Sequence, residues 1–358
     1  MNDKWISVVI PVFNAEDYLQ ECLDSIIHQT IGLEKIEVII VDDASTDRSL
    51  QCIMEYEQQY PEDILVVALK KNNGQADARN IGMEYISAPY FAFLDADDWM
   101  EPDGYEKLIR MAIRYQCDIV QCSSISHLGK ARPMFQKTVS EPVYYKIDNI
   151  EERRRFIRWW NSPGTSGVSI YRTEWIKENN IKFKRFEKYE DNYWGGILSY
   201  YINSYCAIPD YLFHYRRHES SNSLSRNDLK HFERLKVELE LLKYYHEMEL
   251  FTDYYQEIRK HFLEVFYINT LHIVICQFDY FPLEIIKEMQ EVVKSIFPDF
   301  LEYCEDVGEF ANPVLTVPFD FPQEIWEDYK RAYLDYLQGK GENKLVQFYT
   351  VIRRSLGM

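Results

Sequence analysis

The sequence predicts an α/β domain with a largely parallel sheet, followed by a region built from helices alone. Short apolar runs alternate with segments of helical period over about the first 225 residues, a pattern typical of βαβ units. Acidic residues directly follow two of these runs. Because unpaired carboxylates are too costly to bury, these acids mark strand ends at an open edge of the sheet. After about Asn227 only helical periodicity remains.

The first half of the chain supplies most of the predicted sheet. Residues 5–12 form an apolar run, and Asn14 is a suitable N-cap for a helix over 15–30. An apolar run without alternation is typical of a strand buried on both faces. Further strands are predicted at 36–41, 64–69, 90–94 and 118–126, with helices over 75–86 and 102–115.

The pattern weakens after residue 126, where a hairpin is expected between 127 and 146. A helix over 148–160 carries four arginines beside tryptophans. One interpretation is that this helix rests on an anionic membrane surface or an anionic acceptor. We favour the other, in which its apolar side packs inward. Shorter elements follow: a strand at 168–171, helices begun by Thr173 and near Asn192, a strand at 212–216, and a polar loop from 218 to 225 suited to a lid.

The last third is predicted to be a separate helical domain. We place the boundary between residues 226 and 227, giving domains 1–226 and 227–358. No role follows from its sequence; it could form a homodimer, shape an acceptor site or dock at a membrane. The predicted helices are 228–250, 253–277, 281–296, 322–338 and 342–355.

Composition excludes several classes of protein. The net charge of −18 argues against general nucleic-acid binding, which needs a basic surface. Seven scattered cysteines without a Cys-x-x-Cys pair favour reduced thiols in a cytoplasmic protein. The first strand begins too early to leave room for a signal peptide, and no apolar run reaches a membrane span of ~18–20 residues. Any membrane contact is therefore expected to be peripheral.

Nucleotide-binding motifs narrow the class further. The turn after the first strand is Pro-Val-Phe-Asn, at residues 11–14, and contains neither Gly-x-Gly-x-x-Gly nor a Walker sequence. This excludes dinucleotide dehydrogenases and P-loop enzymes. The residues Asp95, Asp97 and Asp98 then remain as the strongest signal, because oxygen ligands at a strand end suit a divalent metal. The alternative is a solvated acidic turn.

Six motifs in one order carry a resemblance to a known family. The chain resembles the family 2 glycosyltransferases of the bacterial surface-polysaccharide type, inverting enzymes with the GT-A (Rossmann-like, nucleotide-diphospho-sugar transferase) fold. The resemblance covers about residues 5–225 and does not extend to the helical region. The motifs lie at 7–14 (SVVIPVFN), 41–47 (VDDASTD), 73–82 (Asn-Gly, then ARNIG), 93–98 (FLDADD), 190–191 (Glu-Asp) and 215–225 (YRRH, then SLS).

The resemblance implies a site for a UDP-sugar donor. Asp43 would accept from the ring N–H of uracil; Asp42 and Ser45 are equally good helix caps, so we expect Asp43 to be free for the base. Phe13 would pack against the base, although a core phenylalanine is the alternative. Arg79 would lie near the nucleotide rather than on a helix surface. The expected donor-site residues are Pro11, Phe13, Asn14, Asp43, Asn73, Arg79, Asp95, Arg216 and Arg217.

The resemblance also implies a metal and a base. Asp97 would ligate Mg²⁺ or Mn²⁺ and Asp95 would bind ribose or support the metal, whereas Asp98 would cap a helix or contact the acceptor. His218 is a candidate further ligand. Asp191 would be the general base that deprotonates the acceptor hydroxyl. Glu190 would orient it, or the pair would only cap the helix that follows.

The function predicted from these residues is metal-assisted, inverting transfer of a sugar from a UDP-sugar to a hydroxyl of a glycan or lipid-linked oligosaccharide. The expected location is cytoplasmic, with peripheral contact at the inner membrane face. Two alternatives stay open. A nucleotidyltransferase would also use acidic metal ligands but should carry a basic glycine-rich loop after the first strand. A non-catalytic sugar-nucleotide or glycan-binding protein would need the base replaced or occluded.

Overall fold

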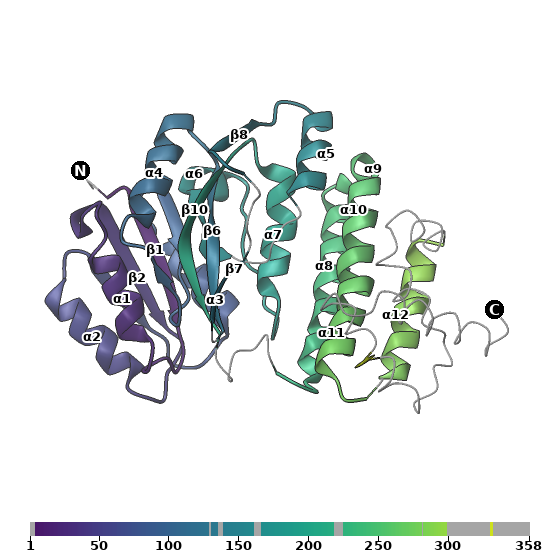
Figure 1. Cartoon of the computed structure of the whole chain (residues 1–358), viewed down its shortest axis with the longest axis horizontal. Helices are drawn as coiled ribbons and strands as arrows, with labels where there is room; N and C mark the ends of the chain where they lie inside the picture. Colours follow the sequence, from purple (N-terminus) through teal and green to yellow (C-terminus); the bar gives the residue numbers. More distant parts are fainter. Residues whose placement is uncertain are drawn as a thin grey trace. The chain divides into compact units, whose positions relative to one another are not determined.

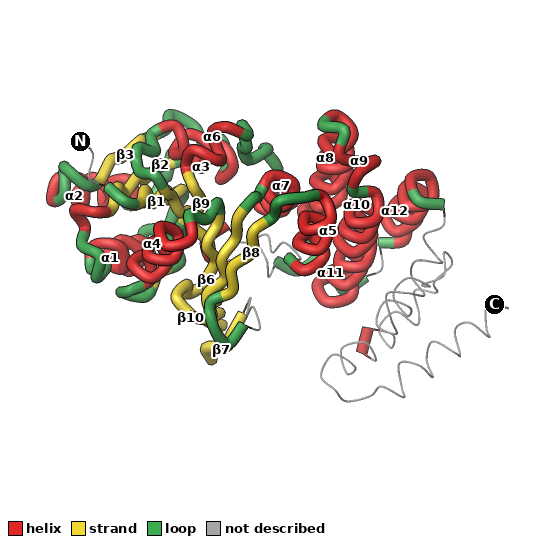
Figure 2. Tube along the Cα trace, turned by 90° about the horizontal axis from the view of Figure 1, so that it is seen from above, coloured by secondary structure: helices red, strands yellow, loops and turns green. Residues whose placement is uncertain are grey.

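The computed structural model describes residues 4–128, 130–134, 139–160, 166–217, 225–280, 282–298 and 330–331. The chain divides into two compact units, Met1–His218 and Glu219–Met358. Figure 2 shows that the strands belong to the first unit and that the second contains helices. The division falls a few residues before the boundary predicted at 226.

The first unit is built on one mixed sheet, with strand order β3-β2-β1-β4-β9-β6-β10-β5; β7 pairs with β6 and β8 with β10. The first four strands run parallel, and β6 is parallel to β10. The other pairs are antiparallel. The strands are β1 (Ile6–Val12), β2 (Ile36–Asp42), β3 (Ile64–Ala68), β4 (Tyr90–Phe93), β5 (Trp99–Met100), β6 (Ile119–Leu128), β7 (Lys130–Met134), β8 (Val143–Lys146), β9 (Ser169–Arg172) and β10 (Ser204–Arg216).

The predicted α/β class is confirmed, and the parallel half of the sheet follows the predicted strands closely. Two departures concern the other half. β9 enters antiparallel between β4 and β6, and β10 is far longer than the predicted 212–216 because register shifts between Ala207 and Phe213 hide its regular alternation. The expected hairpin is the β6–β7 pair.

Helices cover both faces of the sheet (Figures 1 and 2). The even-numbered side chains of β1 share a buried cluster with residues of α1, α2 and α4. The opposite face meets α3, where a side chain on Gly82 would come within 2.4 Å of Val9. That glycine therefore allows α3 to lie close against β1. The helices are α1 (Leu19–Ile27), α2 (Ser49–Gln59), α3 (Gln75–Glu84), α4 (Gly104–Tyr115), α5 (Ile150–Trp159), α6 (Thr173–Glu178) and α7 (Glu190–Tyr201).

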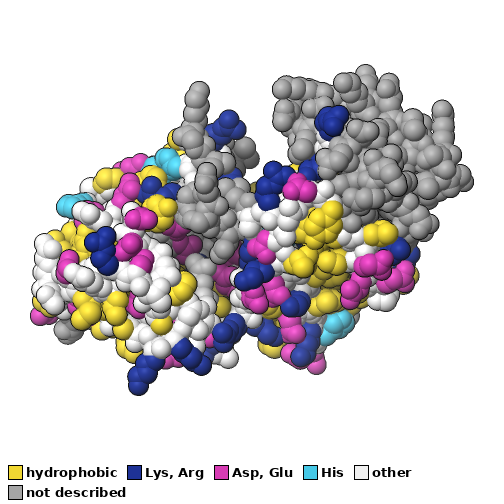
Figure 3. All heavy atoms as spheres, turned by 90° about the horizontal axis from the view of Figure 1, so that it is seen from below, with side chains coloured by type: hydrophobic (Ala, Val, Ile, Leu, Met, Phe, Trp, Pro, Cys, Tyr) yellow, Lys and Arg dark blue, Asp and Glu magenta, His cyan; other side chains and the backbone are white. Residues whose placement is uncertain are grey.

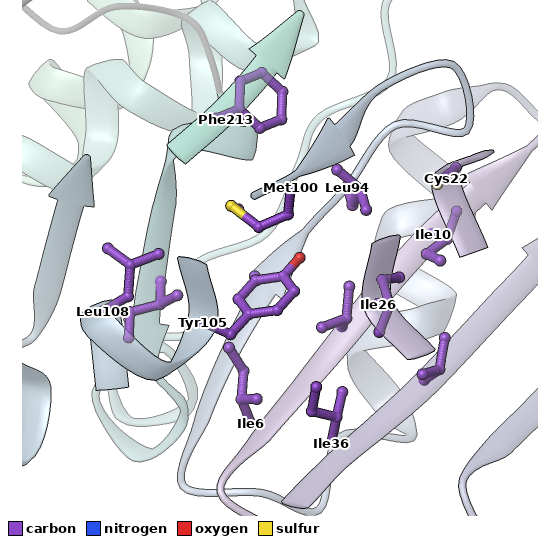
Figure 4. Close-up of a cluster of buried hydrophobic side chains, with 14 of the residues drawn as sticks. Ile6, Ile10, Cys22, Ile26, Ile36, Leu94, Met100, Tyr105, Leu108 and Phe213 are labelled. Carbon is purple, nitrogen blue, oxygen red and sulfur yellow. The ribbon is translucent and has the colours of Figure 1, made fainter. Parts of the chain in front are cut away.

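The main core is mostly aliphatic, and the ring of Tyr105 lies inside it. Tyr105 is fully buried and lies among Ile6, Ile26 and Met100 (Figure 4). Burial of such side chains stabilises a fold by roughly 1.5–3 kcal/mol each. This core fixes the parallel strands whose carboxyl ends carry the candidate site.

One predicted helix start is wrong. α1 begins at Leu19, after Tyr18, and Asn14 is not its cap. Asn14 instead adopts a left-handed φ of 50°, and its side-chain oxygen accepts from the Thr46 backbone N–H at 2.8 Å. The asparagine therefore ties the loop after β1 to the loop after β2, a partner 32 residues away.

The second unit is described as helices α8 (Glu233–Glu247), α9 (Leu250–Asp253), α10 (Tyr255–Phe262), α11 (Thr270–Gln277) and α12 (Leu283–Ile296). A π-helical stretch, Leu263–Asn269, joins α10 to α11. The helices predicted over 228–250, 253–277 and 281–296 are confirmed, although breaks divide the first two. Those predicted at 322–338 and 342–355 lie outside the described residues, apart from helical 330–331. Among the described residues, no helix has the length and apolar character needed to cross a bilayer.

Candidate active site

The candidate site lies where the parallel strands end. Asp43 follows β2, Asp95 follows β4, and Arg216 closes β10. Ladder pairing aligns β1 with both β2 and β4, so the polar residues after these strands meet at one edge. Figure 3 shows acidic and basic side chains interspersed on one face of the molecule.

Asp43 is occupied by backbone contacts. Its two carboxylate oxygens accept from the N–H groups of Asn73 and Gly74, both at 2.8 Å, and the side chain is 3% exposed. The expectation that Asp43 is free is therefore wrong, because the turn before α3 supplies two donors. Gly74 permits that turn through its φ of 94°. Asp43 holds the turn in place, and thereby the start of α3.

Arg79 links two of the predicted acidic motifs. Its guanidinium donates to Asp95 Oδ1 and to Glu190 Oε1, each at 2.7 Å. It is 2% exposed and lies over the rings of Phe93 and Phe183. The helix-surface alternative is therefore wrong. Two carboxylates from distant parts of the chain share one buried cation, and their charges compensate the cost of burying it.

Asp191 is half-buried in the first turn of α7, whose N-cap residue is Tyr189. Burial and the neighbouring Glu190 carboxylate raise the pKa of Asp191 to about 7, while Arg79 acts in the opposite direction. Its Oδ1 accepts from the Asn192 N–H at 3.0 Å. Such a pKa lies close to neutral pH, which is the range required of a general base.

The acidic turn between β4 and β5 divides into an accessible part and a buried part. Asp95 is partly exposed and also accepts from Gln75 at 2.9 Å. Asp98 is 1% exposed, and its Oδ1 accepts from the Arg216 N–H at 2.8 Å. Burial, Asp97 and Asp95 raise the pKa of Asp98. The predicted cap role of Asp98 is wrong, because α4 begins after Asp103.

The donor set suits a hard cation only in part. Carboxylate oxygens are the ligands that Mg²⁺ and Mn²⁺ prefer, and Asp98 Oδ2 is buried without a hydrogen bond from the described residues. Yet no group of three or more His, Cys, Asp or Glu side chains arranged for a metal occurs in the described part of the chain. Mg²⁺ commonly binds one or two carboxylates together with substrate phosphates. The residues therefore fit a metal whose coordination the substrate completes.

Of the two arginines at the end of β10, Arg216 contacts the acidic turn. Arg216 donates through Nε to the Asp97 carbonyl at 2.9 Å and through Nη2 to Glu21 at 2.5 Å. The Arg217 N–H donates to the His127 carbonyl. His218 lies outside the described residues.

Sequence reasoning missed an aromatic and histidine cluster beneath this turn. Trp99 stacks on His214 at 4.8 Å and carries Arg216 over its ring at 4.6 Å. His214 is 2.9 Å from His127 and 2.7 Å from Glu101. Trp99 directly follows the acidic motif, but His127 and His214 lie on strands that pair only in the fold.

Two further expectations concern exposure. Phe13 is 49% exposed, so the core alternative is wrong and the ring is accessible at the strand edge. Pro11 is buried within β1, opposite Val41. In the arginine-rich helix, Phe156 and Trp160 are buried, and Arg153 donates to the Ile202 carbonyl at 2.6 Å. The inward packing that we favoured for this helix is therefore confirmed.

Comparison with known proteins places part of this sequence in a family. The family model "Glycosyl transferase family 2" matches residues 7–179. Glycosyltransferase GlyA of Streptococcus pneumoniae is 36% identical over 150 residues, covering 41% of this chain and 21% of GlyA. The uncharacterized glycosyltransferase YibD of Escherichia coli is 31% identical over 199 residues, covering 53% of this chain and 54% of YibD.

Solved structures agree on the fold. The structure of Staphylococcus aureus TarS 1–349 in complex with UDP-GlcNAc superposes with a TM-score of 0.57 at 18% identity, covering 98% of this chain and 92% of that one. The full-length sequence of TarS, a poly(ribitol-phosphate) beta-N-acetylglucosaminyltransferase of Staphylococcus aureus, is 26% identical to this chain. The match covers 66% of this chain and 40% of TarS. The chain thus spans about half or less of the length of these three curated relatives. Residues 7–179 of the chain belong to glycosyl transferase family 2.

Proposed function

We propose that the protein is an inverting glycosyltransferase that moves a sugar from a UDP-sugar to a hydroxyl of a glycan acceptor. The observation that supports this most strongly is the Asp95–Arg79–Glu190 bridge, which ties the acidic turn to the residue beside Asp191. A donor bound at the turn and an acceptor bound at Asp191 would then lie next to each other, because Arg79 links the two positions. Relatives that bind UDP and UDP-GlcNAc share the fold.

The donor would lie along the strand edge. The exposed ring of Phe13 offers a face for the base, and Asn14 fixes the loop beside it through Thr46. Asp43 would contact uracil through whatever acceptor capacity its two backbone contacts leave, since each carboxylate oxygen accepts more than one hydrogen bond. The bond from Arg79 to Asp95 orients that carboxylate for ribose or metal.

Asp97 and Asp95 would hold Mg²⁺ or Mn²⁺ together with donor phosphates. The chemistry that the cation supplies when bound is Lewis-acid stabilisation of charge on the departing nucleoside diphosphate. Arg216 contributes by fixing the turn, because it donates to the Asp97 carbonyl and to Glu21. Arg217 and His218 are proposed to close over the diphosphate.

Asp191 would accept the proton of the acceptor hydroxyl as its oxygen attacks the anomeric carbon from the side opposite UDP. The new glycosidic bond forms while the bond to the diphosphate breaks, so the configuration inverts. A positioned base contributes roughly 10²–10⁴ in rate. Glu190, fixed by Arg79 at 2.7 Å, would orient Asp191 without touching the acceptor.

The acceptor is proposed to be a surface glycan or lipid-linked glycan. Relatives include the minor teichoic acid biosynthesis protein GgaB and a poly(ribitol-phosphate) beta-glucosyltransferase. A cytoplasmic reaction with peripheral contact at the inner membrane face and dimerisation through the second unit remain predictions.

The test is UDP release from a panel of UDP-sugars, with and without Mn²⁺, by the wild-type chain and Asp191→Asn. We expect the variant to bind UDP normally and to lose nearly all transfer. Asp148→Asn is the matched control, because Asp148 is an exposed aspartate paired with Lys146. Transfer by Asp191→Asn at the wild-type rate would refute the base, and absence of turnover with every donor would favour a non-catalytic binding protein.

A further inference from the structure

A short basic segment, residues 182–188, leads directly into the helix that carries Asp191. Its sequence, KFKRFEK, contains four Lys or Arg residues and one Glu, a net charge of +3 within a chain of net charge −18. Lys182, Lys184 and Arg185 are exposed. Clustered positive charge in an acidic protein creates a local field that attracts anions.

The backbone of the basic segment is fixed by buried apolar residues within it and directly before it. Ile181 and Phe183 are 3% and 4% exposed, and Phe183 stacks on Trp194 of α7 at 4.4 Å. Asn80 of α3 bonds both the N–H and the carbonyl of Phe183, each at 2.9 Å. Lys182 and Lys184 alternate with these buried residues and are exposed, as expected where an extended chain places successive side chains on opposite sides.

The outward cations lie beside the two helices that build the candidate site. Lys184 Nζ is 5.7 Å from the ring centre of Tyr193, two residues after Asp191. Arg185 Nη1 is 3.8 Å from Asp77 Oδ2, in the first turn of α3. The basic segment therefore borders the N-terminal turns of α3 and α7, which hold Arg79, Glu190 and Asp191.

The position of these cations favours a contact with the acceptor over one with the donor. The donor diphosphate is assigned to the acidic turn after β4, whereas Asp191 faces the acceptor hydroxyl. A polyanion approaching a chain of charge −18 is repelled unless positive groups surround the point where it must dock. Arginine offers a planar fork that suits phosphate oxygens.

We propose that the basic segment forms a rim of the acceptor site and selects an acceptor chain that carries phosphodiester groups. The inference rests on the proposed function, because it takes Asp191 as the base that meets the acceptor. The three cations, on Lys182, Lys184 and Arg185, would contact the phosphodiester groups that flank the reacting hydroxyl. These side chains take no part in the chemistry.

The test compares two variants of the full chain. The rim variant carries Lys182→Gln, Lys184→Gln and Arg185→Gln. The control carries Lys146→Gln, Lys287→Gln and Lys294→Gln, which removes the same charge at exposed or half-exposed lysines. In the strand pairing of β8 with β10, Lys146 lies opposite Ser204, so it is at the other end of β10 from Arg216. Binding of a fluorescent poly(glycerol phosphate) oligomer is measured at low and high salt, with neutral dextran, a polyuronate and anionic lipid vesicles as further arms.

We expect the rim variant to bind poly(glycerol phosphate) about tenfold more weakly at low salt, since three exposed contacts of two- to threefold each multiply. Its salt dependence should fall, and its affinity for UDP should stay unchanged. The control should bind like the wild type.

Three results would overturn the inference: equal losses in both variants, a loss of UDP affinity confined to the rim variant, or wild-type binding to vesicles or polyuronate that matches or exceeds binding to poly(glycerol phosphate). The binding assay needs no turnover, so a failure of the proposed function would appear separately, in the transfer assay with Asp191→Asn.

Discussion

Asp191 combines partial burial with a carboxylate neighbour, and this governs how both activity and stability depend on pH. Its pKa is raised to about 7, so the folded chain holds a proton that the unfolded chain releases above pH ~4. The contribution of Asp191 to the free energy of unfolding is therefore present at low pH and is lost as the pH rises toward 7. In the proposed role of Asp191 as the base, activity should run the opposite way, because only the ionised form can accept a proton.

We expect kcat for transfer to fall about tenfold per pH unit well below pH 7. We also expect Asp191→Asn to raise the melting temperature at pH 8, since it removes a charge from a desolvated site, and to change it little at pH 4. Rate profiles and thermal unfolding at the two pH values measure both effects. An unchanged melting temperature at pH 8 would mean that Asp191 is solvated like a surface aspartate.

The environment of Arg79 leads to a prediction about stability. Its removal leaves Asp95 and Glu190 without their shared cation, and breaking a buried pair costs roughly 3–5 kcal/mol. We expect Arg79→Met to lose that much stability in urea unfolding. The double variant Arg79→Met, Glu190→Gln should recover part of the loss, because one of the two stranded charges is then removed. A double variant no more stable than Arg79→Met would show that the pair with Glu190 contributes little.

At the scale of elements, the turn between β4 and β5 is proposed to bind a metal only together with a substrate. No metal site with three side-chain ligands occurs among the described residues, and the Asp97 carbonyl is already bonded to Arg216. We expect calorimetry to find weak Mn²⁺ binding to the free protein and binding at least tenfold tighter with UDP present, because phosphate oxygens complete the coordination.

The variant Asp97→Ala tests this coupling. It should abolish the dependence of UDP affinity on Mn²⁺ while leaving UDP binding without metal nearly unchanged. Glu101→Ala is the control, as an acidic residue of the same segment whose contact is His214. Equal Mn²⁺ dependence in the wild type and Asp97→Ala would remove Asp97 from the metal site.

The elements that could be predicted from sequence are those with local causes. β1, β2 and β4 follow from continuous apolar runs, and α3 follows from a turn and a helical period. Asn14 was expected to cap a helix and Asp43 to be free for the base, but each instead bonds backbone groups about 30 residues away. Likewise, nothing local marks β9 as antiparallel, since its partners β4 and β6 are set by tertiary packing.

At the scale of the molecule, the two units differ in the charged groups that they bury. The first holds Arg79 between Asp95 and Glu190. The second buries Glu238, which is 1% exposed and lies 3.2 Å from His261. Burial alone would lower the pKa of His261, but the Glu238 carboxylate raises it. The stabilisation from this histidine is therefore full below pH ~6.5 and is lost as the pH rises through the raised value.

This difference predicts two separable thermal transitions. The proposed donor site lies in the first unit, so UDP should raise the transition of that unit by mass action and leave the other in place. Raising the pH from 6 to 9 should lower the transition that UDP does not move. Ile10 and Leu241 are fully buried, in β1 and α8, and truncation of either to alanine costs roughly 2–5 kcal/mol. We expect Ile10→Ala to lower the UDP-sensitive transition and Leu241→Ala the other, as followed by differential scanning calorimetry. A single transition that moves with UDP and with both variants would instead show that the helical unit and the glycosyltransferase unit unfold as one cooperative body.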